Sequence, residues 1–122
     1  MSNISINQTG GALSIGVQSN SLLVVSFSIS IYGSDGTTVL EFYTGDTTKV
    51  NPAYTSLPQA PSTYVGNYVA VTLTLFDPSG GTPSYNVDIT INQGGAALPP
   101  ATNANGAMGP GINTVHSIFH LQ

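Results

Sequence analysis

The chain has 122 residues, and only 5% of them are charged. Soluble domains average about 25%. A single basic residue, Lys49, cannot neutralise a row of phosphates, so the composition excludes nucleic-acid binding and attachment to anionic membranes through a basic patch. The absence of cysteine excludes disulfides, thiolate chemistry and cysteine zinc sites.

No apolar stretch approaches the roughly 20 residues of a membrane-spanning helix, so we expect no membrane insertion. Residues 1–11 lack the basic start and long apolar run of a signal peptide. The cell location is therefore not determined by the sequence, although an extracellular or surface-exposed assembly is favoured.

Apolar residues recur with a period of two, which is typical of half-buried β-strands. From Leu23 onward, for example, alternate residues up to Ile31 are apolar and the residues between them are mostly serine. No window of ten or more residues shows a helical stripe. The predicted strands, in chain order, are 4–7, 13–17, 23–31, 39–43, 47–50 (brief), 64–76 and 85–92.

These short strands alternate with turn signals such as Gly33–Gly36, which favours an all-β fold. We predict a single antiparallel β-sandwich of about seven or eight strands over residues 1–93, of jelly-roll or immunoglobulin-like type. Residues 94–113 are rich in glycine, alanine and proline and carry no charge, so we predict a linker. Alternation resumes in a terminal strand at 114–122, with Val115, Ser117, Phe119 and Leu121 on one face and His116, Ile118 and His120 on the other.

No group of residues indicates catalysis. Four positions apart in a strand, His116 and His120 lie about 13 Å from each other, too far to chelate one metal ion. Asp35 and Asp77 lie in turn signals, where aspartate is expected for backbone hydrogen bonding alone. A Gly-x-Ser-x-Gly nucleophile elbow is absent from the sequence. We therefore predict a protein that is not an enzyme and needs no cofactor or metal.

The leading functional prediction is a structural subunit that associates with copies of itself into a filament, tube or shell. Sheet edges are normally guarded by charges and prolines, and here Lys49 is the only basic guard. Both chain ends carry strand-forming segments, so association could proceed through sheet edges or through exchange of a terminal strand. The residues predicted to carry the assembly are Ile4, Ile6, Val115, Ile118, Phe119 and Leu121.

The alternative is a carbohydrate-binding, lectin-like module whose partners are glycans. Tyrosine combines an apolar ring with a polar tip, which suits stacking on sugar rings. The predicted ligand residues are Tyr64, Asn67 and Tyr68, which lie close together at the start of the longest predicted strand. The absence of tryptophan, the strongest stacking platform, weakens this alternative.

Overall fold

The structure is a computed structural model of the chain, and it describes residues 1–21, 23–76, 84–107 and 113–122. Asp77, which the sequence places in a turn, lies outside the described residues. The elements, in chain order, are strands β1 (Ser2–Ile4), β2 (Leu13–Ser19), β3 (Val24–Tyr32), β4 (Val39–Asp46) and β5 (Ala53–Ser56), the 3₁₀ helix η1 (Pro61–Tyr64), and strands β6 (Tyr68–Phe76), β7 (Ser84–Gln93), β8 (Ala96–Ala107) and β9 (Asn113–Leu121).

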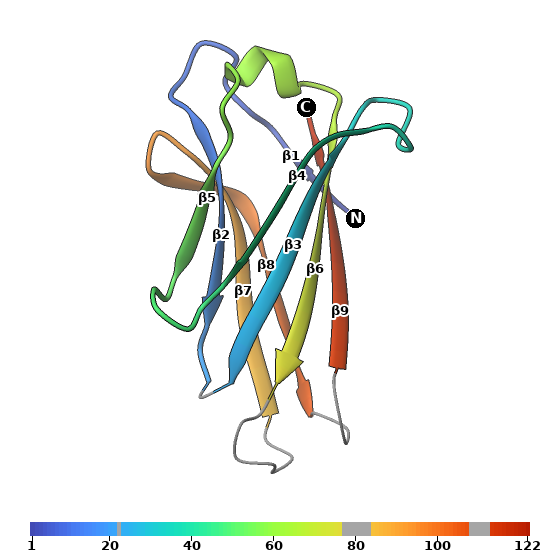
Figure 1. The fold of residues 1–122 in the computed structure, drawn as a ribbon. Helices are drawn as coiled ribbons and strands as arrows, with labels where there is room; N and C mark the ends of the chain where they lie inside the picture. The colour runs from blue at the N-terminus through green and yellow to red at the C-terminus, as the bar shows by residue number, and fades with distance from the viewer. Residues whose placement is uncertain (22, 77–83, 108–112) are drawn as a thin grey trace.

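The strands form two sheets that lie over each other in a sandwich-like arrangement (Figure 1). One sheet has five strands in the order β1-β9-β6-β3-β4, and the other has four in the order β5-β2-β7-β8. Neighbouring strands are antiparallel, except that β1 pairs with β9 in parallel. The predicted all-β class is therefore confirmed.

The period of two in the sequence sets the core. The inward side chains of β3 and β6 are buried, and they lie directly opposite one another in the register, as Ile29 does with Val71. Between them, the serines of β3 and the threonines of β6 point outward and stay partly accessible. Burial of one apolar row on each strand is what selects this register, because a one-residue slip would turn every apolar side chain outward.

The stretch 94–113, predicted as a linker, instead contains β8, which pairs with β7 along most of its length. Prolines 99 and 100 lie where this pairing shifts register, opposite residues 89–91 of β7. Because β8 is an edge strand, proline there removes few sheet hydrogen bonds. The 114–122 segment is likewise no appendage, since β9 lies within the five-stranded sheet between β1 and β6.

The segment between β4 and β6 also differs from the prediction. No strand forms at 47–50; a short strand forms later, at Ala53–Ser56, and pairs with β2. The strand expected from residue 64 begins at Tyr68, because Pro61 starts the 3₁₀ helix η1 that ends at Tyr64. Proline fixes a φ that suits the first position of a helix and lacks the N–H that a strand needs.

Three cross-strand pairs place an aromatic ring over a glycine, namely Phe27–Gly45, Tyr54–Gly16 and Tyr85–Gly106. A Cβ added to Gly45 would stand 2.6 Å from Cζ of the buried Phe27 ring. Such contacts let the ring cover the glycine backbone, which compensates the poor strand propensity of glycine. Each pair includes an edge strand, so these rings hold the sheet margins in place.

The turn between β3 and β4 is held by Asp35, as the sequence predicts. The Asp35 carboxylate accepts hydrogen bonds from the Oγ1 of Thr38 at 2.5 Å and from the backbone N–H groups of Thr37 and Thr38 at 3.0 Å each. These bonds, the side-chain bond first, lower the pKa of Asp35 to about 2. The turn is therefore anchored at any pH above the ordinary carboxyl range.

Candidate functional site

The two terminal segments predicted to carry assembly lie side by side. Strand β1 pairs with the end of β9, with Ile4 opposite Leu121. The backbone N–H of Ile6 donates to the carbonyl of Gln122 at 2.9 Å, and the Gln122 N–H donates to the carbonyl of Ile4 at 2.8 Å. In this structure both ends of the chain are thus strands of the chain's own sheet.

Most of the predicted assembly residues face the core. Ile4, Phe119 and Leu121 are buried, and Ile6 and Val115 are half-buried against the same cluster. Ile118 alone points to the outer face, with 47% of its surface exposed. Only this residue of the set offers an accessible apolar side chain for contact with a partner.

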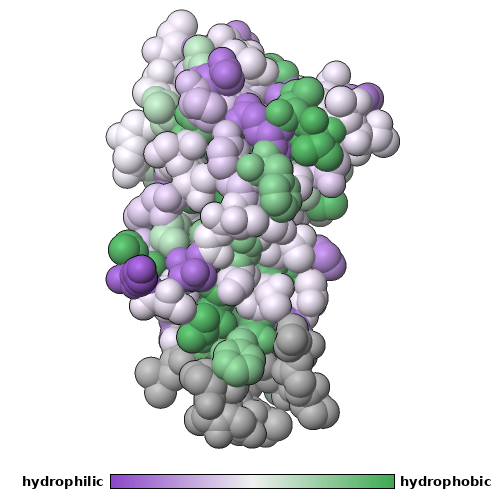
Figure 2. All heavy atoms as spheres, viewed as in Figure 1, coloured by the Kyte–Doolittle hydropathy of each residue, from purple (hydrophilic) through white to green (hydrophobic). Residues whose placement is uncertain are grey.

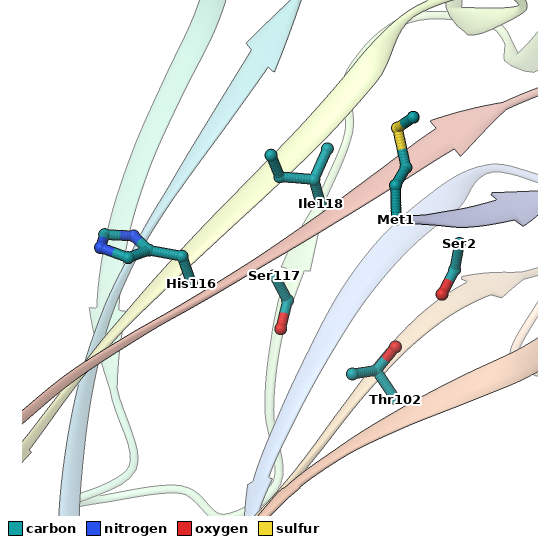
Figure 3. A pocket seen from close by; sticks show the side chains of 6 residues that line it. All are labelled: Met1, Ser2, Thr102, His116, Ser117 and Ile118. Atoms are coloured by element: carbon teal, nitrogen blue, oxygen red, sulfur yellow. The ribbon is translucent and has the colours of Figure 1, made fainter.

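Strand β1 covers only the last part of β9, which leaves an open edge beside it. β1 pairs with residues 119–121, and no strand among the described residues pairs with 114–118 on that side. A hollow of about 320 Å³ lies there, bounded by Met1 and Ser2 of the N-terminal segment, Thr102 of β8 and residues 116–118 of β9 (Figure 3). In Figure 3, Ser117 points toward Thr102, while Ile118 lies on the opposite side of β9. The hollow is therefore an exposed sheet margin between the two layers.

The backbone of β9 presents hydrogen-bonding groups to this open side. The N–H of Leu121 donates to the carbonyl of Asn67, so Leu121 is bonded to the β6 side. Because hydrogen bonding alternates along an antiparallel strand, the N–H and C=O groups of Thr114, His116 and Ile118 point away from β6. The bond between Gln122 and Ile4 follows the same alternation.

The opposite margin of the same sheet is β4, and it is also open. Within the described part of the chain, β4 pairs with β3 alone. The N–H of Thr47 donates to the carbonyl of Val25 at 3.0 Å, so by the same alternation the backbone groups of Phe42, Thr44 and Asp46 point away from β3. The strand has eight residues and contains no proline or lysine.

Strand β4 also carries exposed apolar side chains. Phe42 is 59% exposed, Leu40 55% and Val39 53%. Figure 2 shows hydrophobic surface gathered over the upper part of β4, with hydrophilic and intermediate surface beside it. The sequence analysis missed these residues, although a signal exists. In 39–43, apolar residues stand at both odd and even positions around a single acid, whereas in the preceding strand they stand mainly at alternate positions.

A partly buried polar cluster fixes the inner face of β4. The carboxylate of Glu41 accepts a hydrogen bond from the hydroxyl of Tyr43 and another from the hydroxyl of Tyr64 at 3.1 Å. The Tyr64 hydroxyl accepts in turn from the backbone N–H of Gln59 at 3.1 Å. This cluster joins β4 to the η1 region. Because side chains alternate along a strand, Phe42 and Leu40 then point to the opposite face, toward solvent.

The cluster predicts alkaline lability. Burial, followed by the bond to Glu41, raises the pKa of Tyr43 to about 12, and burial is also the largest cause that raises the pKa of Tyr64 to about 12. A raised pKa favours the neutral hydroxyl in the folded state, so this stabilisation is complete below about pH 10 and is lost as the pH rises toward 12. We expect an absorbance titration at 295 nm to show that Tyr43 and Tyr64 ionise only as the pH approaches about 12. Tyr43→Phe and Tyr64→Phe should each remove one of these two high-pH ionisations. Titration of all tyrosines near pH 10 while the protein stays folded would contradict this.

The three residues predicted to bind sugar do not form one accessible surface. Tyr64 is completely buried, so its ring offers no stacking face, and Asn67 is buried as well. Tyr68 is half-buried, and its ring stacks on His120 with the centroids 4.4 Å apart. The tyrosine that does expose its ring is Tyr54 on β5, at 62%.

In the part of the chain that the structure describes, no three histidine or acidic side chains gather as a metal site would require. The same residues include no helix with the length and apolar character needed to cross a bilayer.

Comparison with known proteins finds no family model, no curated protein and no solved structure that matches this chain.

Proposed function

We propose that this chain is a non-catalytic structural subunit that joins copies of itself head to tail through the two open edges of its five-stranded sheet. The observation that carries the proposal is that both margins of this sheet, β4 and residues 114–118 of β9, present backbone groups that no described strand pairs with. Charges, prolines and bulges normally guard a sheet edge. On β4 a register shift lies at the start of the strand and Asp46 at its end, and Glu41 bonds Tyr43 and Tyr64.

The directions of the two edges support head-to-tail joining. Three antiparallel pairings separate β9 from β4, so the two strands run in opposite directions. A copy that is shifted sideways therefore brings its β4 antiparallel to β9 of its neighbour, which continues the pairing found throughout this sheet. Because such an interface is heterologous, each added copy leaves a new open edge, and growth gives a filament.

Estimated free energies indicate which contribution decides whether the subunits associate. Three outward-facing residues on β9 offer at most about six backbone hydrogen bonds, together about 3–9 kcal/mol. Association costs about 4–15 kcal/mol in lost freedom. The two terms nearly balance, so burial of exposed apolar side chains decides the outcome, at about 1 kcal/mol for each half-exposed residue covered. Phe42, Leu40 and Ile118 supply that term.

Edge addition is also favoured over exchange of β9. Exchange of β9 must first take Phe119 and Leu121 out of the core and break the pairing with β1 and β6, and these contacts return only when the β9 of a second copy takes the same place. Adding a strand at an open edge breaks nothing within the subunit. The neighbour's strand then extends the sheet, as in β-augmentation.

We expect a single lysine at either edge to disperse the assembly. Phe42→Lys and Ile118→Lys each place a charge where the next sheet would pair, and each should give particles of monomer mass by light scattering and no filaments by negative-stain microscopy. Tyr54→Lys makes the same change at an exposed aromatic on the other sheet and should leave assembly intact. Filaments that survive both edge variants would overturn the proposal.

A further inference from the structure

The open edge of β9 has a sharp end. Its backbone groups that point away from β6 belong to Thr114, His116 and Ile118, and β1 occupies the edge from Phe119 onward. Met1 precedes the pairing of β1 and is 81% exposed, so it can move aside. An incoming strand therefore finds three residues to pair with, and no more.

A bulge ends the open edge of β4 in a similar way. The pairing of β4 with β3 is regular as far as Glu41 and then skips Leu40. A bulge bends its strand and disrupts regular pairing. In the regular part of the strand, the backbone groups that point away from β3 belong to Phe42, Thr44 and Asp46. Each edge thus offers three residues.

The three residues of one edge stand level with the three of the other across the sheet (Figure 1). Residues directly opposite each other in neighbouring strands share a face of the sheet. All six edge residues are exposed, so this shared face is the outer one. Read from β4 through β3 and β6 to β9, the rows are Phe42, Ser30, Ala70, Ile118; then Thr44, Ser28, Thr72, His116; and then Asp46, Ser26, Thr74, Thr114.

This match points to one register for the joined edges, in an inference that rests on the proposed head-to-tail association. We propose that the β4 of one copy pairs with the β9 of the next with Phe42 opposite Ile118, Thr44 opposite His116, and Asp46 opposite Thr114. Each row then continues into the same row of the next copy, so the copies align without stagger along the strands. The bulge that precedes Phe42 turns the incoming strand away from Ser2, which pairs with Phe119.

Other antiparallel registers use fewer of the open groups. A shift of one residue sets the open groups of one strand against groups of the other that already bond within its own sheet. A shift of two residues in one direction carries Phe42 to the level of His120, where Asn3 of β1 already lies. A shift of two in the other direction brings the bulge of β4 to Ile118 and carries Asp46 beyond the start of β9. Each two-residue shift also separates Phe42 from Ile118, the exposed apolar side chains at the two edges.

Disulfide trapping tests the register on the full chain, which contains no cysteine of its own. Thr44→Cys is mixed in turn with Thr114→Cys, His116→Cys and Ile118→Cys, and each mixture is oxidised and run on a non-reducing gel. Opposite residues have Cα atoms about 5.5 Å apart, within disulfide range, whereas residues displaced by two positions lie about 9 Å apart, beyond it. We expect His116→Cys to give at least tenfold more mixed dimer than either of the other two.

Each variant oxidised alone controls for thiols that meet by collision, and circular dichroism shows whether each one folds. Where Thr44→Cys does not fold, Phe42→Cys mixed with Ile118→Cys and with His116→Cys makes the same comparison in the next row, and Ile118→Cys should then dominate.

Equal yields in all mixtures, or a higher yield at a displaced position, would overturn this register and leave head-to-tail joining in place. A yield no higher than in the controls would overturn it as well. Light scattering then separates the two failures, because filaments mean that the edges pair differently, whereas monomers mean that the proposed self-association is itself wrong.

Discussion

Thr44→Pro and His116→Pro variants are each expected to remain monomers when alone and to form a one-to-one dimer when mixed. Proline at 44 removes an N–H from the open side of β4, and proline at 116 does the same on β9, so each variant retains one working edge. In the mixture, the intact β9 of the first can accept the intact β4 of the second. Size-exclusion chromatography with light scattering measures the mass directly.

This experiment distinguishes head-to-tail joining from a symmetric dimer. If β4 paired instead with β4 of another copy, His116→Pro alone would dimerise and mixing would add nothing. Thr44→Val and His116→Ala are the matched controls, because they change the side chains while retaining the backbone N–H. Both controls should assemble, and His116→Ala also tests the hydrogen bond between His116 and Thr72, 3.0 Å in length.

Gly45→Val is expected to destabilise the fold more than valine does at the exposed neighbouring position, Thr44. The added Cβ would meet the Phe27 ring at 2.6 Å, and the ring is buried, so it has little room to move. Overpacking of this kind costs about 1–3 kcal/mol, which lowers the melting temperature by several degrees in a domain of this size. Circular dichroism during heating measures the change.

A second variant tests whether the ring causes the loss. Phe27→Leu shortens the side chain opposite Gly45, so Gly45→Ala should cost less in a Phe27→Leu background than in the wild type. A difference of about 1 kcal/mol between the two backgrounds is expected for residues in direct contact. Equal costs in both backgrounds would show that the glycine is required for another reason.

Much of the fold was predictable because apolar residues recur with a period of two through most of the sequence. The strands around Ile29 and Val71 alternate so regularly that their inward faces follow from the sequence, and the structure confirms these faces. The faces of the terminal strand were also predicted correctly, with Phe119 buried and Ile118 exposed.

The sequence failed where composition and tertiary context conflict. Residues 96–107 contain two prolines and mostly small residues, which is typical of a linker, yet pairing with β7 makes them an edge strand. Tyr64 is followed by an alternating run, but it is buried in the core and its hydroxyl donates to Glu41, a partner 23 residues away in sequence. Contacts between distant segments leave no local signal.

The candidate site was only partly predictable for the same reason. Terminal strands at 4–7 and 115–121 suggested where association could occur, but the sequence could not show that β1 covers only residues 119–121 of β9. The order of strands in the sheet, which makes β4 the opposite edge, depends on connections that cross between the two sheets. The exposed apolar side chains of β4 become a candidate surface only once that order is known.

Sedimentation equilibrium of the wild-type protein over a wide concentration range tests the central claim most directly. Head-to-tail joining through open edges predicts a mean mass that rises steadily with concentration and reaches no plateau, because each added copy presents a new edge. A mass that stays at the 12.5 kDa of one chain at every concentration would contradict the account.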